Sequence, residues 1–317
     1  MTTSGVYSFS VSRDDIIRQA MLNIKRLDPD ETPTATETND CARVLNMMCK
    51  QWMGKSDFAP GLKVWTRKRG VLLLSNSTGI LTIGPTAQGW SNSMAVTTLA
   101  ATAAEGSTSL SVASATGFTT GYTLAVELDS GSLQYLTISG VAGTTITVPA
   151  LNSQASSGNA VYCYQTAAQN PRKIETALLR DEFNTDTPLN IMTVQTYDQL
   201  PNKTDPNNVG DPTAIYVEEG LTTTTIYTDV GACQDVSKYI VLTYLEPVQD
   251  FTTTTDTPYY PQEWYLALCW GLTEQIAPMF SAMWTDKMES LKNTAIAIAR
   301  NHSAEISDLY FQPGNDG

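Results

Sequence analysis

Residues 88–165 constrain the fold most strongly, because this stretch is almost free of charge. It contains only three charged side chains, Glu105, Glu127 and Asp129, and is dense in Gly, Ser, Thr and Ala. Short runs such as YTLAVEL and TTITVPAL alternate apolar with polar residues, and DSG and AGT lie between such runs as turns. A period of two residues with closely spaced turns is typical of antiparallel β structure. We therefore predict a self-contained β-sandwich or barrel-like module over 88–165, inserted into a larger domain.

Both ends of the chain predict amphipathic helices. Ser12 with Asp15, and Thr34 with Glu37, match capping boxes, and apolar residues follow each pair at helical spacing. The C-terminal region shows the same spacing after the linker TTTTDTPYYP. Helices are expected over 13–27, 34–53, 264–280 and 285–307.

Between these helices the sequence predicts short strands, with alternating patterns over 64–84, 213–229 and 238–247. The expected fold class is α+β: a helical bundle formed by the N-terminal helix pair and the C-terminal helices, with short β-strands, plus the inserted all-β module. The expected domains are a core made of 1–87 and 166–317, and the module at 88–165.

Charge and residue usage bear on several function classes. The chain has 19 Lys and Arg against 32 Asp and Glu, a net charge of −13, so it lacks the positive field that holds nucleic acid tightly. One histidine, His302, argues against catalytic triads and His-rich metal sites, and no glycine-rich phosphate loop is present. We expect no cofactor and no metal.

The cysteines and the hydrophobicity pattern indicate the cellular compartment of the protein. The five cysteines have no metal-binding spacing and are expected to be buried thiols in a reducing compartment. No export leader and no apolar run of membrane-spanning length are found. The sequence therefore predicts a soluble protein with no membrane partner.

Three other patterns suggest functions that compete with simpler structural roles. Neighbouring carboxylates such as Asp181 with Glu182 and Glu218 with Glu219 would be needed by a cell-wall glycan hydrolase, but such pairs are usually solvated. The module's aromatic residues would suit a carbohydrate- or receptor-binding protein, although several fall on strands and serve a core. A basic cluster next to Trp65 is a possible DNA contact or a charged strand edge, and it comprises Lys63, Arg67, Lys68 and Arg69.

The opening of the chain resembles a known family. Residues 12–53 contain a helix, a loop with Glu-Thr-Pro, and a second helix with Ala42, Leu45 to Met48 and Trp52. This order is similar to the start of the head-to-tail adaptors of short-tailed bacteriophages, also called packaged-DNA stabilisation or tail accessory proteins. Later segments are also similar to that family, namely LTIGP at 81–85, Tyr197 to Pro201 and Pro212 to Tyr216.

The resemblance covers roughly 10–87 and 166–310 and leaves out the module. It implies a structural virion protein at the head-tail junction, assembled in the host cytoplasm, and not an enzyme. The implied partners are the portal protein, tail or nozzle proteins, further copies in a ring of about twelve, and DNA passing transiently through a central channel. The implied portal contacts are the C-terminal apolar residues Leu309, Tyr310 and Phe311 together with Trp264 and Tyr265.

Overall fold

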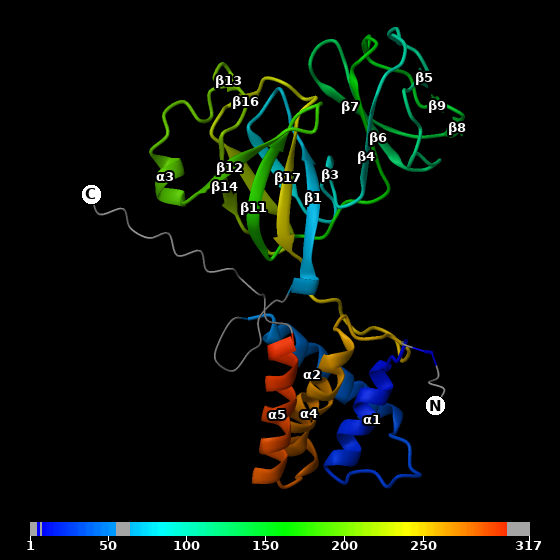
Figure 1. Cartoon of the computed structure of the whole chain (residues 1–317), viewed down its shortest axis with the longest axis vertical. Coiled ribbons are helices and arrows are strands. Elements are labelled where there is room, and N and C mark those ends of the chain that lie inside the picture. Colours follow the sequence, from blue (N-terminus) through cyan, green and yellow to red (C-terminus); the bar gives the residue numbers. More distant parts are fainter. Residues whose placement is uncertain (1–4, 7, 55–63, 303–317) are drawn as a thin grey trace. The chain divides into compact units, whose positions relative to one another are not determined.

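The computed structural model describes residues 5, 6, 8–54 and 64–302 (Figure 1). The chain divides into two compact units. One combines residues 1–66 with 248–317 and is called the helical unit; the other spans residues 67–247 and is called the β unit.

The helical unit is built from four longer helices and short 3-10 turns. Its longer helices are α1 (Arg13–Asn23), α2 (Ala35–Trp52), α4 (Tyr265–Ile276) and α5 (Asp286–His302), and its 3-10 turns are η1 (Val64–Thr66), η2 (Gln262–Trp264) and η3 (Ala277–Phe280). Both expected capping boxes are confirmed, because Ser12 and Thr34 each accept a backbone N–H and their partners Asp15 and Glu37 each accept one in return. These reciprocal bonds satisfy backbone donors that would otherwise lack a partner at the helix starts.

The core of the helical unit is rich in tryptophan. Trp264 is fully buried, and its ring centroid lies 6.0 Å from that of Trp52 and 5.5 Å from that of Trp65. Gly271 of α4 lets α2 approach, since a Cβ at this position would lie 2.6 Å from the Trp52 ring. Helix α4 therefore packs its small and aliphatic buried residues, such as Leu268 and Leu272, beside large aromatic rings from neighbouring segments.

The β unit contains an eight-stranded sheet in the order β2-β15-β14-β12-β11-β17-β1-β3. Its neighbours are antiparallel except β12 and β14, which run parallel. The strands are β1 (Arg67–Leu73), β2 (Ile80–Ile83), β3 (Trp90–Ser91), β11 (Lys173–Arg180), β12 (Asp186–Met192), β14 (Ala214–Glu218), β15 (Thr224–Thr228) and β17 (Tyr239–Leu245). A short helix, α3 (Val194–Asp198), and a two-stranded pair, β13 (Val209–Gly210) with β16 (Ala232–Cys233), complete this part.

The expected fold class is wrong. The protein is mostly β, with 25% helix and 29% strand, and its largest element is the nearly closed eight-stranded sheet, not a helical bundle with short strands. The difference arises because β1 pairs with β17, and β2 with β15, across long separations in sequence. Local periodicity predicts that a strand exists but does not predict its distant partner.

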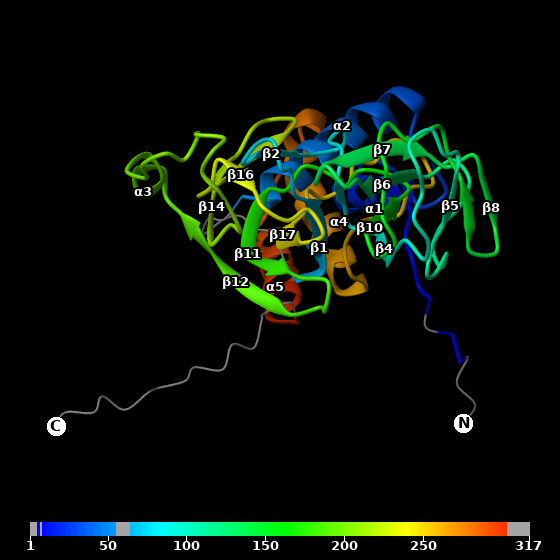
Figure 2. The same ribbon diagram turned by 90° about the horizontal axis from the view of Figure 1, so that it is seen from above.

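The inserted stretch forms two smaller sheets. One has the order β4-β10-β6-β7 and the other β5-β9-β8. Their bounds are β4 (Met94–Thr98), β5 (Ser109–Ser111), β6 (Thr123–Glu127), β7 (Leu133–Thr137), β8 (Gly140–Ala142), β9 (Thr145–Thr147) and β10 (Ala160–Tyr164). Figures 1 and 2 show these strands on one side of β1 and β17, with α3 on the other.

The module has its own core but also packs on the eight-stranded sheet. Sixteen buried residues, including Leu110, Leu124 and Ile146, form a cluster within it. A second cluster joins Ala125, Ala160 and Tyr162 to Leu73, Tyr239 and Val241 of the large sheet. Trp90 and Ser91 pair with β1 in the large sheet, so the module's own strands begin at Met94. The expected limits of 88 and 165 stay a prediction.

Candidate functional site

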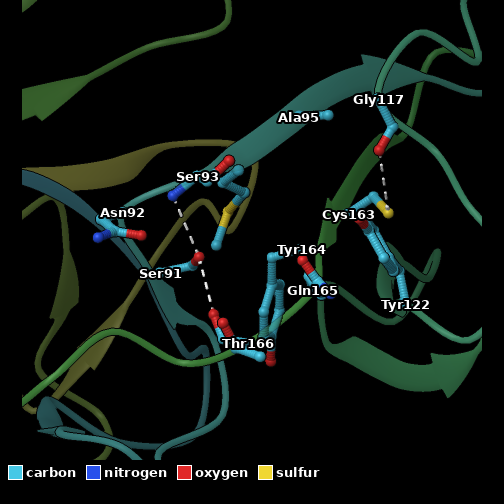
Figure 3. Close-up of a pocket in the computed structure, with 11 residues that line it drawn as sticks. Ser91, Asn92, Ser93, Ala95, Gly117, Tyr122, Cys163, Tyr164, Gln165 and Thr166 are labelled. Atoms are coloured by element: carbon cyan, nitrogen blue, oxygen red, sulfur yellow. Dashed lines mark hydrogen bonds between the residues drawn. The ribbon is translucent and has the colours of Figure 1, made fainter. Parts of the chain in front are cut away.

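A cavity of about 400 Å³ lies where the chain enters and leaves the module (Figure 3). Figure 3 shows the entering segment on one side and the leaving segment, with Tyr122 and Gly117, on the other. The lining residues are Ser91, Asn92, Ser93, Met94, Ala95, Gly117, Tyr122, Cys163, Tyr164, Gln165 and Thr166. We call this cavity the module pocket.

Hydrogen bonds hold the two segments side by side. The Ser91 hydroxyl donates to the Thr166 carbonyl oxygen at 3.0 Å and accepts the Ser93 N–H at 3.2 Å. Farther along, Met94 and Tyr164 are direct partners in the β4–β10 ladder. The Tyr164 hydroxyl accepts the Gly89 N–H at 2.9 Å, which ties the leaving segment back to the turn before β3. The pocket walls are therefore fixed by the fold.

The pocket walls carry no charged side chain, because its lining contains no Asp, Glu, Lys, Arg or His. Burial raises the pKa of the Cys163 thiol to about 11, so this group is protonated at neutral pH. Burial also raises the pKa of the Tyr164 phenol. The pocket is thus equipped for hydrogen bonding and not for nucleophilic or acid–base chemistry by these groups.

Several polar side chains at the pocket have unused hydrogen-bonding capacity. Asn92, Gln165 and Thr166 are exposed, and no hydrogen bond joins their side chains to any other described residue. The two amides each offer a donor and an acceptor, and the hydroxyl offers both. Sequence reasoning missed these residues; the only signal that could have found them is their position at the two boundaries where the charge content changes.

A second cavity, of about 230 Å³, lies between β4 and the turn that joins β11 to β12. Asp181 and Glu182 line it, but the Asp181 carboxylate accepts the N–H groups of Phe183 and Thr185, as turn residues do. Burial raises the pKa of the neighbouring Glu127, and nearby carboxylates including Asp235 and Glu182 raise it further. This cavity is an acidic recess beside a structural turn.

The expected basic cluster does not form one patch. Arg67 and Arg69 lie on the face of β1 that carries Val71 and Leu73, whereas Lys68 lies on the opposite face, because side chains alternate along a strand. Arg67 pairs with Glu175 at 2.6 Å and Lys68 with Glu246 at 3.7 Å. Arg69 is exposed and contributes, after Arg180, to a lowered pKa of Asp186. Lys63 lies outside the described residues.

The residues expected to bind a portal also have different environments. Trp264 is fully buried in the helical unit, so its side chain packs in the core. Tyr265 is half-buried, and its ring lies 6.2 Å from that of Phe9. Leu309, Tyr310 and Phe311 lie outside the described residues.

Two of the carboxylates singled out for glycan chemistry make structural hydrogen bonds. Asp181 holds a turn, and Glu218 accepts the Tyr227 hydroxyl at 2.7 Å. The module's aromatic residues mainly fill cores: Trp90, Phe118, Tyr162 and Tyr164 are buried, while Tyr122 and Tyr135 are half-buried.

Among the described residues, no group of three or more His, Cys, Asp or Glu side chains is placed to hold a metal ion. No helix within 5–54 or 64–302 combines the length and the apolar character needed to span a bilayer.

No protein-family model matches the chain, and no curated protein matches its sequence.

Proposed function

We propose that the protein is a structural component of a phage virion, a head-to-tail adaptor that forms a ring of about twelve copies beneath the portal. In this role it joins the capsid to tail or nozzle proteins and retains packaged DNA. The proposal places it at the head-tail junction after assembly in the host cytoplasm. The resemblance of its terminal regions to such adaptors is the first support.

Part of the resemblance lies on the packing face of one helix. Ala42, Leu45, Met48 and Trp52 of α2 are all buried in the helical unit. The similarity therefore follows a core-forming pattern rather than scattered surface positions. A shared core pattern favours a shared helical fold.

The observation that carries the proposal is a row of apolar side chains on the outside of α5. Leu291 is 42% exposed and Ile298 is 60% exposed. They are seven residues apart, so they lie within about 20° of each other around the helix. Lys292, Ala295 and Ala299 face the core of the unit. We call Leu291 and Ile298 the α5 row.

The helical unit has further exposed apolar residues. Leu266 is 58% exposed and Met283 is 84% exposed. Large exposed apolar side chains on a small helical unit fit a surface that another subunit covers. In an adaptor, the covering surfaces are neighbouring copies and the portal.

The charge of the chain fits passage of DNA. A net charge of −13 repels phosphates, so DNA would pass through a channel of such subunits without strong attachment. Arg67 and Lys68 are already paired with carboxylates, which further limits tight DNA contact.

Placing charges in the α5 row should prevent assembly without unfolding the protein. We expect Leu291→Glu/Ile298→Glu to weaken association with the portal protein by at least about tenfold, because carboxylates would be desolvated in an apolar contact. The thermal unfolding temperature should change little, since both positions are exposed. Sedimentation velocity of mixtures with the portal measures the association.

The matched control is Gln275→Glu/Asn190→Glu, which adds the same charge at exposed polar positions. This control should assemble as the unmodified protein does. Co-sedimentation of the α5 variant with the portal at unmodified affinity would remove the α5 row from the assembly surface.

A further inference from the structure

We infer that the module pocket binds a neutral, polyhydroxylated ligand, namely a single sugar residue or the end of an uncharged glycan. This binding function is separate from ring assembly, and a single copy of the chain contains every residue it requires. The pocket volume of about 400 Å³ falls within the range of small-molecule sites, about 300–1,000 Å³.

The lining excludes charged ligands by its chemistry. An anionic ligand needs Lys, Arg, His or a helix N-terminus, and none of those side chains lines the pocket. The net charge of −13 adds a repulsive field against anions. A cationic ligand would need a carboxylate partner, and the lining residues include no Asp or Glu. Of the polar ligand classes, only a neutral one therefore suits the pocket lining.

The hydrogen-bonding groups match a polyol. Asn92 and Gln165 present amides from the entering and leaving segments, and Thr166 adds a hydroxyl. Each of these groups can both donate and accept, as each sugar hydroxyl does. Because no described residue engages these side chains, a ligand would not have to break internal hydrogen bonds to reach them.

The apolar part of the lining suits the less polar face of a sugar ring. Tyr122 is half-buried and presents a ring at the pocket wall (Figure 3), and Met94 and Ala95 of the entering segment also line the pocket. Tyrosine combines an apolar ring with a polar hydroxyl, so it contacts amphipathic ligands at low entropic cost. The pocket therefore combines amides on both segments with an aromatic ring in its lining, which suits one sugar ring.

The pocket lies at the two connections of the module, so a bound ligand should affect how these connections move. Residues 91–95 and 163–166 are the two connections of the module, and both line the pocket. A ligand that bonds to both connections should slow their local opening. Backbone amide exchange in these two segments should therefore decrease when the ligand is bound.

The test titrates the full chain with methyl glycosides of glucose, galactose, rhamnose and N-acetylglucosamine, followed by protein-observed NMR. We expect at least one to bind and to shift resonances of residues 91–95 and 163–166, whereas methyl glucuronide, which is anionic, does not bind. Asn92→Ala/Gln165→Ala should weaken that binding about tenfold through loss of two hydrogen-bonding groups. Both residues are exposed, so the variant should fold.

The control Gln169→Ala/Asn190→Ala removes the same two residue types from exposed positions outside the pocket and should leave binding unchanged. The inference is overturned if none of the four neutral glycosides binds at 50 mM, on the order of the weakest useful site affinity. It is equally overturned if the pocket variant binds as the unmodified chain does, or if the glucuronide binds as well as the neutral glycosides. None of these outcomes bears on ring assembly.

Discussion

Replacing Trp264 with alanine should destabilise the helical unit by about 3–5 kcal/mol, the usual cost of removing a large buried side chain. Trp264 is fully buried, and its ring centroid lies 6.0 Å from Trp52, 5.5 Å from Trp65 and 5.8 Å from Tyr260. These residues come from three separate segments of the helical unit, namely α2, η1 and the stretch from Tyr260 to Trp264. Alanine would leave a cavity among rings that are too rigid to fill it.

Hydrogen exchange resolved by peptide measures this effect in each unit. Peptides from α1, α2, α4 and α5 should lose protection, whereas those from β11 and β17 should keep theirs, because the large sheet has its own buried cluster. Leu266→Ala is the control, since Leu266 is 58% exposed and its loss should cost little. Equal effects of the two substitutions would contradict the core described for this unit.

Two deletions of the module should differ sharply in stability. Removing Met94 to Tyr164 and joining Ser93 to Gln165 through a short glycine linker should leave the large sheet folded, because Met94 and Tyr164 are adjacent ladder partners and the ends are close. Removing 88–165 also removes Trp90, which is fully buried and lies 5.3 Å from the Tyr244 ring. Losing Trp90 should lower the free energy of unfolding of the large sheet by a further amount of about 3–5 kcal/mol.

Gly70 of β1 provides the space that the Trp90 ring occupies in the sheet. A Cβ on Gly70 would lie 2.2 Å from the Trp90 ring, so the glycine leaves the space that the indole fills. Both deletions uncover the same face of β1 and β17, and their comparison therefore isolates β3. Urea unfolding followed by circular dichroism measures the difference, and identical midpoints for the two variants would show that Trp90 is dispensable.

Local sequence patterns predicted the helix starts well. Ser12 with Asp15 and Thr34 with Glu37 form the expected capping boxes, because such boxes depend only on residues three apart. The alternation within 94–164 likewise corresponds to real strands, and two of their pairs, β6–β7 and β8–β9, join neighbours in the chain. Features with local causes could therefore be predicted from the sequence.

The large sheet and the pocket could not be predicted in the same way. Arg67 pairs with Leu245, and no local pattern links these residues. The run Arg67, Lys68, Arg69 looked like one basic patch, but strand alternation divides it between two faces. Asn92 and Gln165 meet at the module pocket only because β4 and β10 pair. In each case the decisive contact is long-range.

Electron microscopy of the purified protein mixed with the portal protein of the same virion would show whether this chain assembles as an adaptor ring. The proposal predicts rings of about twelve copies attached to one end of the portal, with the α5 row of each copy covered by a neighbouring copy or by the portal. Portal particles without attached density, beside free monomers at saturating concentration, would contradict it.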